Sequence, residues 1–256
     1  MHVPEDYDGT EEQPVVVTLH SYGSSAEEHL DYTQMVPDAD DESFVLVAPE
    51  GSGLPPRFDQ EIGITSQVDD VAFVVSLLDR VSTELCVDAS RVYAVGQSNG
   101  AGLAAVLGCR EPARFAAIAM SSLLLLPEGC EQPAPAVLAY MGTNDITIPF
   151  GGGHVECCGG WEVPPADMTM AAWAAHGGCE AEPDVDDLGD GIERRVWSGC
   201  GPDGEREVRY FVIDGGGHTW PGSDTEVPFG ETTQALDAAE ETWRFFRRFT
   251  LPDAGG

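Results

Sequence analysis

Val92-Tyr-Ala-Val-Gly-Gln-Ser98-Asn-Gly-Ala-Gly102 is the stretch of sequence from which the fold can be inferred. Its first four residues are typical of a buried strand, and residues 103–107 after it are typical of an apolar helix. The Gly-x-Ser-x-Gly pattern between them is the signature of a tight strand-to-helix turn, where glycines stand because a Cβ would not fit. Such a turn projects the Ser98 hydroxyl above the sheet edge and places it at a helix N-terminus, which favours a developing negative charge. Ser98 is therefore the candidate nucleophile, and an ordinary N-cap serine in a glycine-rich turn is the alternative.

The rest of the chain alternates predicted strands with predicted helices. Short apolar runs without period-2 alternation, as expected of strands buried on both faces, occur at 15–19, 44–48, 115–119, 136–140 and 208–213. Apolar residues at helical spacing predict a helix over 68–85, and a last helix is expected over 232–249. The segments expected to be loops are 151–153, 183–190 and 215–217. This order predicts an α/β fold with a mostly parallel sheet and helices on both faces.

The charge of the chain is extreme. It carries 45 Asp and Glu against 12 cationic side chains, all of them Arg, for a formal net charge of -33 at pH 7. Such a surface repels a phosphate backbone, so nucleic-acid binding is excluded, and adhesion to an anionic membrane surface is disfavoured. Disorder is excluded because 42% of the residues are hydrophobic. Since salt screens the repulsion between carboxylates, we predict a halophilic or salt-tolerant protein. A genome that replaced Lys by Arg would explain the missing lysines but not the surplus of carboxylates.

One domain is expected over residues 1–256, with 251–256 as a frayed tail, because no long linker interrupts the pattern. No apolar run approaches the roughly 20 residues of a membrane span. The first residues do not resemble a secretion leader, so either the chain is not secreted or a leader has been removed. The cysteines favour the second alternative, and we expect the chain to be trimmed. Seven cysteines in spacings that fit no zinc pattern indicate an oxidising compartment, and their odd number leaves at least one thiol. We expect an extracellular monomer.

A serine nucleophile needs a histidine base, and that histidine needs a carboxylate. In the order of α/β-hydrolases, the serine is followed along the chain by the acid and then by the histidine. Asp145 and His218 each follow directly after a predicted strand, so both are expected at the sheet edge that carries Ser98. The alternatives are an Asn-Asp turn for Asp145 and an ordinary loop histidine for His218. His2 and His29 are expected at the surface.

Two backbone N–H groups are needed to hold a tetrahedral oxyanion. Asn99, directly after the nucleophile, is expected to supply one, and Tyr22, in the loop after the first strand, the other. Gln97 and the aromatic rings of Tyr22, Trp220 and Trp161 are the candidates for contact with the substrate, although aromatic residues in loops often only pack.

The motifs resemble those of a known family. Extracellular polyhydroxybutyrate depolymerases and feruloyl esterases have similar motifs, which this chain carries at Leu19-His-Ser-Tyr-Gly-Ser-Ser25, Val68-Asp-Asp-Val-Ala-Phe73, Cys86-Val-Asp-Ala-Ser-Arg-Val-Tyr-Ala-Val-Gly-Gln-Ser-Asn-Gly-Ala101, Gly142-Thr-Asn-Asp145 and Gly216-Gly-His-Thr-Trp-Pro-Gly222. The similarity spans nearly the whole chain. It implies an α/β-hydrolase fold and a secreted serine esterase with Ser98, Asp145 and His218 as its triad and with no metal or organic cofactor.

The resemblance also implies that Cys179 and Cys200 form a disulfide. Cys86 lies just before the nucleophile strand and Cys109 at the far end of the following helix, so both are expected at the same end of the sheet, where they can form a bridge. Cys130 is the competing partner for Cys109.

Two local features stand apart from common patterns. The family's usual His-Gly-Tyr is replaced by His20-Ser-Tyr22, which puts a Cβ and a hydroxyl beside the oxyanion loop. Cys157 and Cys158 lie near His154, but ligands this close in sequence cannot complete a tetrahedral site alone, so no metal is expected.

We therefore expect a secreted carboxylic-ester hydrolase that acts on a polyester or on hydroxycinnamoyl esters. The alternatives are an aromatic polyester hydrolase of the cutinase type, and an acyltransferase or peptidase that uses the same triad. A non-catalytic binding protein that kept the fold is favoured only by Ser21.

Overall fold

The computed structural model describes residues 1–130 and 133–252. Its centre is an eight-stranded sheet in the order β2-β1-β3-β4-β5-β10-β9-β8. Its strands are β1 (Gln13–Leu19), β2 (Val45–Val47), β3 (Val87–Gln97), β4 (Ala117–Ser121), β5 (Ala136–Gly142), β8 (Asp184–Gly189), β9 (Ile192–Cys200) and β10 (Arg206–Ile213). The first six in spatial order pair in parallel, and β9 and β8 continue the sheet antiparallel. This is the arrangement of an α/β-hydrolase.

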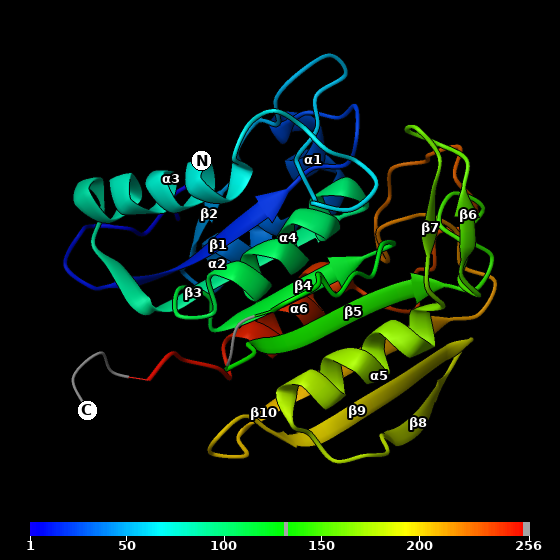
Figure 1. The fold of residues 1–256 in the computed structure, drawn as a ribbon. Helices are drawn as coiled ribbons and strands as arrows, with labels where there is room; N and C mark the ends of the chain where they lie inside the picture. Colours follow the sequence, from blue (N-terminus) through cyan, green and yellow to red (C-terminus); the bar gives the residue numbers. More distant parts are fainter. Residues whose placement is uncertain (131–132, 253–256) are drawn as a thin grey trace.

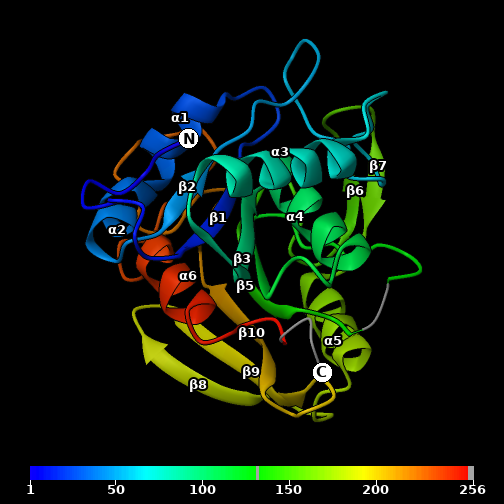
Figure 2. The ribbon, with the colours of Figure 1, turned by 90° about the vertical axis from the view of Figure 1, so that its left-hand side faces the viewer.

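Six helices cover the two faces of the sheet. They are α1 (Ala26–Thr33), α2 (Met35–Asp41), α3 (Asp70–Glu84), α4 (Asn99–Arg110), α5 (Ala166–Gly177) and α6 (Ala238–Phe246). Figures 1 and 2 show α3, α4 and α5 on one face and α1, α2 and α6 on the other. Within the described ranges no helix is long and apolar enough to cross a membrane.

The apolar runs of the central strands follow from this double cover. In β1, Val15, Val17 and Leu19 are buried in the core beneath α3 and α4, whereas Val16 between them is buried in the core beneath α2 and α6. A strand with a helix layer on each face needs apolar side chains at consecutive positions, which removes the period-2 alternation. The predicted strands therefore form the parallel part of the sheet.

Acidic side chains mark where several helices begin. Ser25 and Glu28 form a capping box at α1, and Asp69 accepts a hydrogen bond from the N–H of Ala72 at the start of α3. These caps satisfy amide groups that have no partner within the helix. The predicted helix 68–85 is confirmed as α3, and the helix expected over 232–249 is confined to α6.

The structure corrects the sequence prediction at the edge of the sheet and in one loop. The acidic stretch 183–190, expected as a loop, forms the exposed edge strand β8. A two-stranded hairpin, β6 (Gly153–Val155) and β7 (Trp161–Val163), overlaps the predicted loop 151–153. Of the expected tail, Leu251 donates its N–H to Ser90 and is therefore held, while 253–256 lie outside the described residues.

Two disulfides are present, Cys109–Cys130 and Cys179–Cys200. The second is the bridge that the family resemblance implied. The expected Cys86–Cys109 bridge is wrong: the segment after β4 brings Cys130 to the end of α4, while Cys86 stays beside β1, where its carbonyl accepts the Gln13 N–H. The competing pairing of Cys109 with Cys130 is the one that forms.

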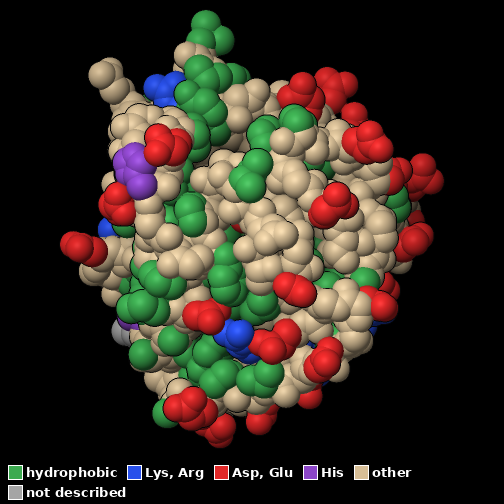
Figure 3. All heavy atoms as spheres, turned by 90° about the vertical axis from the view of Figure 1, so that its right-hand side faces the viewer, with side chains coloured by type: hydrophobic (Ala, Val, Ile, Leu, Met, Phe, Trp, Pro, Cys, Tyr) green, Lys and Arg blue, Asp and Glu red, His purple; other side chains and the backbone are tan. Residues whose placement is uncertain are grey.

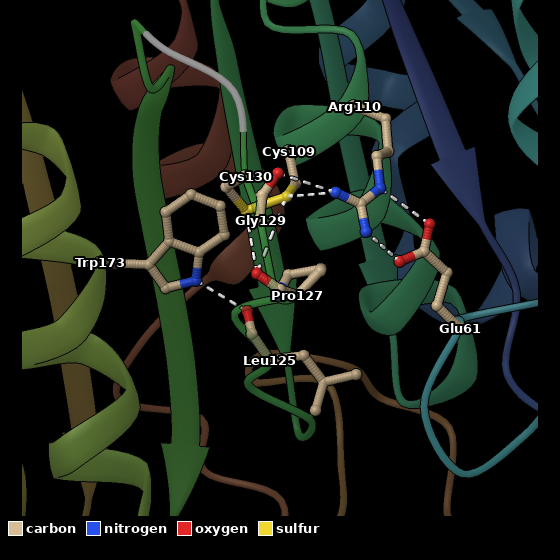
Figure 4. The surroundings of a disulfide bond; sticks show 8 residues. All are labelled: Glu61, Cys109, Arg110, Leu125, Pro127, Gly129, Cys130 and Trp173. Atoms are coloured by element: carbon tan, nitrogen blue, oxygen red, sulfur yellow. Dashed lines mark hydrogen bonds and ion pairs between the residues drawn. A yellow bond between two sulfur atoms is a disulfide. The ribbon is translucent and has the colours of Figure 1, made fainter.

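Arg110, next to this disulfide, holds the loop between β2 and α3. Its guanidinium donates to both carboxylate oxygens of Glu61 and, at 3.1 Å, to the carbonyl of Gly129 (Figure 4). The bidentate ion pair ties the loop to α4, the helix that starts at the candidate nucleophile.

Asp38 on α2 faces several other acids, because α2 packs against α6. Its pKa is raised to about 6 by burial and by the charges of Asp237, Glu240, Asp41 and Glu42. The folded state therefore holds this proton more tightly than the unfolded chain, and Asp38 reduces stability as the pH rises from about 4 through 6.

Asp38→Asn is expected to raise the melting temperature by a few degrees at pH 8 and to change it little at pH 4, because only the ionised carboxylate is penalised. Calorimetry at both pH values measures the difference. Asp31→Asn, on the exposed side of α1, is the control. Equal shifts for the two variants at pH 8 would show that the acids on α6 do not act on Asp38.

Candidate active site

Ser98 lies at the turn between β3 and α4, with φ of 54° and ψ of -119°. A non-glycine residue in this region costs about 1–3 kcal/mol and persists only where its surroundings enforce it. The two glycines of the motif supply those surroundings: a Cβ on Gly96 would lie 2.2 Å from the carbonyl carbon of Gly100, and a Cβ on Gly100 would lie 2.0 Å from the carbonyl oxygen of Leu19. The Ser98 N–H also donates to Ser121 on β4 at 2.8 Å. The turn is thus fixed by both neighbouring strands.

Gly100→Ala is expected to lower the free energy of unfolding by about 3 kcal/mol or more and to remove most activity, since the new methyl group would force α4 away from β1. Gly151→Ala is the matched control, because a Cβ there meets nothing within 4 Å. Its expected effect is below about 0.5 kcal/mol. Urea unfolding and ester hydrolysis measure the two quantities. Equal stability of the two variants would contradict the close approach of α4 and β1.

Asp145 and His218 are brought together by the loops after β5 and β10. His218 Nδ1 lies 2.7 Å from Asp145 Oδ2, and the Asp145 side chain is fully buried. The second oxygen, Asp145 Oδ1, accepts the N–H groups of Thr147 and Ile148, each at 2.8 Å. A carboxylate held in this way fixes the ring of His218 with Nδ1 as donor, which leaves Nε2 as the basic nitrogen.

Glycines explain why these two loops can meet. A Cβ on Gly142 would lie 2.1 Å from the carbonyl oxygen of Gly216, so the loops touch backbone to backbone. The Asn144 N–H donates to the same oxygen at 2.9 Å, and the His218 N–H donates to Phe229 at 2.8 Å. The glycine run before His218 is therefore a requirement of close packing.

Tyr22 and Asn99 both border the cleft that contains Ser98. Within residues 1–130 and 133–252, the backbone N–H groups of these two residues donate to no protein acceptor. The Ser21 hydroxyl, which stands where the family usually has glycine, donates to the backbone and side-chain oxygens of Gln97 at 3.3 and 3.1 Å. The added side chain is thus directed at the residue before the nucleophile.

Two buried side chains hold the loops around these amide groups. His20 Nε2 accepts the Gly51 N–H at 2.8 Å, so its Nδ1 carries the proton and donates to the Ser21 carbonyl at 2.8 Å. The Asn99 side chain accepts the N–H of Phe58 at 2.8 Å and donates to its carbonyl at 2.9 Å. Both residues are completely buried. They position the backbone on the two sides of Ser98.

Ser98 and His218 open into one cleft of about 470 Å³. Its walls come from loops on several elements and are largely apolar; they include Tyr22, Ile64, Leu123, Ile148, Trp161 and Phe229. Figure 3 views the molecule from the side of β6 and β7, where acidic side chains crowd the margin and hydrophobic or uncharged groups fill much of the middle. The cleft is therefore suited to an uncharged, partly apolar ligand.

Of the four residues predicted to contact the substrate, three line the cleft and one is buried in the core. Tyr22, Gln97 and Trp161 line the cleft. Trp161 packs on Gly63, where a Cβ would lie 2.3 Å from the indole ring. Trp220 is 1% exposed and packs at 6.3 Å from the ring of Tyr140, so the prediction that it contacts the substrate is wrong. It belongs to the core beneath α6.

Sequence analysis missed some residues of the cleft and misplaced another. Tyr32 and Phe229 line it, and Phe229 stands edge-on to the ring of His218. The expectation that His29 lies at the surface is wrong, because the residue is 2% exposed. Its Nε2 atom shares a hydrogen bond of 2.9 Å with the hydroxyl of Thr18. Burial and the nearby His20 lower the pKa of His29 to about 3, so it is uncharged at neutral pH. The one sequence signal for His29 was its place on the inner face of a capped helix.

The arrangement brings together a candidate nucleophile, a candidate base, a carboxylate that orients that base, and two amide groups that have no acceptor among the described residues. These are the groups that acyl transfer through a covalent intermediate requires. Across the described residues no three His, Cys, Asp or Glu side chains gather as metal ligands.

Comparison with known proteins agrees with this geometry. Residues 4–141 match the family model described as esterase PHB depolymerase. The chain is 25% identical to "Feruloyl esterase B" of Piromyces equi, in an alignment that covers 97% of this chain and 44% of that protein. It is 26% identical to "Probable feruloyl esterase C" of Aspergillus niger, in an alignment that covers 96% of this chain and 82% of that protein. It thus spans less than half of the Piromyces equi protein and most of the Aspergillus niger one.

Among solved structures, the acetyl xylan esterase from Aspergillus awamori superposes with a TM-score of 0.67 at 14% identity, covering 96% of this chain and 92% of the other. At this identity the likeness concerns the fold alone. The match to the family model extends over more than half of the sequence. The chain therefore belongs to the esterase PHB depolymerase family, a family of carboxylic-ester hydrolases.

Proposed function

We propose that this protein is a serine carboxylic-ester hydrolase in which Ser98, His218 and Asp145 form the catalytic triad. The observation that carries the proposal is the Asp145–His218 pair, joined at 2.7 Å and opening into the same cleft as the strained Ser98. His218 Nε2 removes the proton of the Ser98 hydroxyl, whose oxygen attacks the ester carbonyl carbon. Asp145 stabilises the imidazolium that forms.

The tetrahedral oxyanion is held by the backbone N–H groups of Tyr22 and Asn99, neither of which has an acceptor among the residues that the structure describes. When the intermediate collapses, His218 donates its proton to the departing alcohol and an acyl-enzyme remains on Ser98. A water molecule, deprotonated by His218, then releases the acid by the same route. Attack by an alcohol or an amine instead of water at this step would give an acyltransferase, whereas acylation by an amide substrate with release of an amine would give a peptidase. Product analysis with alcohol and amine acceptors, and an assay on peptide substrates, separate these alternatives.

For the substrate we propose hydroxycinnamoyl or polyester ester bonds. Support comes from the largely apolar lining of the cleft, from the Trp161 ring fixed against Gly63, and from the similarity to proteins named feruloyl esterase B and feruloyl esterase C. An aromatic ring in the wall of an apolar cleft stacks on a planar aromatic acyl group. An aromatic polyester is the second candidate, favoured by the same ring.

Trp161→Ala is expected to raise KM for methyl ferulate about tenfold and to change hydrolysis of p-nitrophenyl acetate less than about twofold, because only the larger acyl group reaches the ring. Trp220→Phe is the control, since that buried tryptophan should affect stability and not KM. The assay runs methyl ferulate, a polyhydroxybutyrate film and p-nitrophenyl acetate side by side. Equal losses on all esters would contradict a role of Trp161 in acyl recognition.

We also propose that the protein works outside the cell. The two disulfides support an oxidising compartment, because cytosolic thiols are kept reduced. Fractionation of the source organism, with detection of the protein in the medium, tests this.

A further inference from the structure

Cys157 and Cys158 are adjacent in sequence and both line the candidate active-site cleft. They lie in the turn between β6 and β7, just before the cleft residue Trp161. Both are half-buried and outside any disulfide. The proposed esterase mechanism uses neither thiol, so it does not explain why both line the wall of the cleft.

The two thiols lie close enough to act on one another. Burial and the neighbouring Cys157 thiol raise the pKa of Cys158 to about 12, so this thiol is protonated at neutral pH. A protonated thiol is a poor nucleophile. Cys158 is therefore the thiol that reacts second with an oxidant, after Cys157.

The backbone of the turn has freedom to rearrange. Cys158 has a φ of 60°, and Gly159 and Gly160 follow with φ of 107° and 73°. A Cβ built on Gly159 meets nothing within 4 Å, so the turn is open on that side. Glycine at both positions, with Gly159 in open space, allows the cysteine backbone to adjust.

The two disulfides of the chain indicate an oxidising environment. Cys109–Cys130 and Cys179–Cys200 are formed, so the protein is built for surroundings in which thiols oxidise. A pair of accessible neighbouring thiols in the same surroundings is exposed to the same oxidants.

We propose that Cys157 and Cys158 are a redox-active pair that closes into a disulfide between adjacent residues and thereby reshapes the wall of the cleft beside Trp161. With a small-molecule disulfide as oxidant, one cysteine thiolate attacks it and releases one thiol. The second cysteine gives up its proton and displaces the other half as a second thiol. Two S–H bonds are lost, one S–S bond forms in the protein, and the oxidant is reduced to two thiols.

Closure joins the two side chains into a small ring that includes the peptide bond between them. The ring removes two thiol donors from the cleft and fixes the turn that precedes Trp161. This consequence rests on the proposed function, and it predicts a change in KM for esters with a bulky acyl group, of about threefold or more, with a smaller change for p-nitrophenyl acetate.

The test compares the full chain after incubation with oxidised glutathione and after reduction with dithiothreitol. Peptide mass spectrometry after alkylation should show that the peptide with residues 157 and 158 loses two hydrogen atoms and takes up no alkylating agent in the oxidised sample. Phenylarsine oxide, which bridges two neighbouring thiols, should bind only the reduced sample. Cys157→Ser and Cys158→Ser should each abolish both responses, and Cys86→Ser, the control for the third free thiol, should retain them.

A stable glutathione adduct on a single cysteine, oxidation confined to Cys86, or disulfide-linked dimers would overturn the proposal. Closure of the ring without any change in KM would overturn its role in the cleft wall. The mass and arsenical readouts do not need catalysis. If the ring forms and no ester is hydrolysed, the redox pair stands and the proposed esterase function fails.

Discussion

Ser98→Ala is expected to lower kcat for p-nitrophenyl acetate by about 10⁴-fold or more, with little change in the melting temperature. The loss is large because the covalent intermediate cannot form without the hydroxyl, and the fold survives because the serine side chain makes no structural hydrogen bond at the turn. Relief of the positive φ is not expected, since alanine adopts that conformation no more easily than serine. A fluorophosphonate probe followed by mass spectrometry should label Ser98 in the native protein and nothing at this position in the variant.

Ser122→Ala is the matched control for this experiment. Ser122 also follows a strand, has a φ of 62° and is buried, but its hydroxyl donates to the Thr219 carbonyl and does not reach the cleft. We expect this variant to lose about 1 kcal/mol of stability and to keep its activity within about threefold. If Ser98→Ala retained ester hydrolysis, or if the probe labelled Ser122 and not Ser98, the proposed nucleophile would be wrong.

Asp145→Asn examines the same triad without removing the nucleophile. Its Oδ1 can still accept the amide groups of Thr147 and Ile148, so the loop should keep its shape. The amide can no longer stabilise the His218 imidazolium, and kcat should again fall by about 10⁴-fold. The two variants should differ in labelling, because Ser98 of Asp145→Asn remains present and reacts slowly with the probe.

The parts of the fold that sequence predicted are those that local patterns encode. Consecutive apolar residues in β1 and β3 follow directly from burial on both faces. Ser98, Asp145 and His218 were singled out because each stands in a glycine-containing loop directly after a strand, and parallel strands bring such loops to one edge. The structure adds that Asp145 and His218 are in contact.

The parts that sequence missed depend on contacts between distant segments. Every residue of β8 is exposed and half of them are acidic, so its own composition does not indicate a strand. It forms because β9 offers an edge, with Arg194 paired to Asp186. Trp220 looks like an exposed loop residue, but its backbone N–H donates to the hydroxyl of Tyr32, which lies on the same face of the sheet, and its ring is buried in the core. The partner of Cys109 likewise depends on a distant contact, because the segment after β4 brings Cys130 to the end of α4.

Raising NaCl from 0.1 M to 2 M at neutral pH is expected to raise the melting temperature by about 10 °C, because the Debye length falls from about 10 Å to below about 3 Å. The net charge of -33 makes repulsion between carboxylates the dominant electrostatic term of the folded surface. Acids gather between α2 and α6, where burial, together with their repulsion, raises the pKa of Asp38. Differential scanning calorimetry over a salt series measures the effect.

Salt also weakens attractive ion pairs. Whether it raises or lowers the melting temperature therefore depends on whether the repulsion it relieves is larger than the attraction it removes. Most of the 12 arginines already lie in ion pairs, and many of these are exposed, such as Arg80–Glu84 and Arg114–Asp79. Exposed pairs contribute about 0–1 kcal/mol each, and few cations remain to offset the excess acids. Screening should therefore stabilise the fold on balance, and the gain should level off near 1 M and shrink at pH 4, where carboxylates become protonated. A melting temperature that rises equally at pH 4 and pH 8 would indicate general salt exclusion from the surface and not relief of charge repulsion.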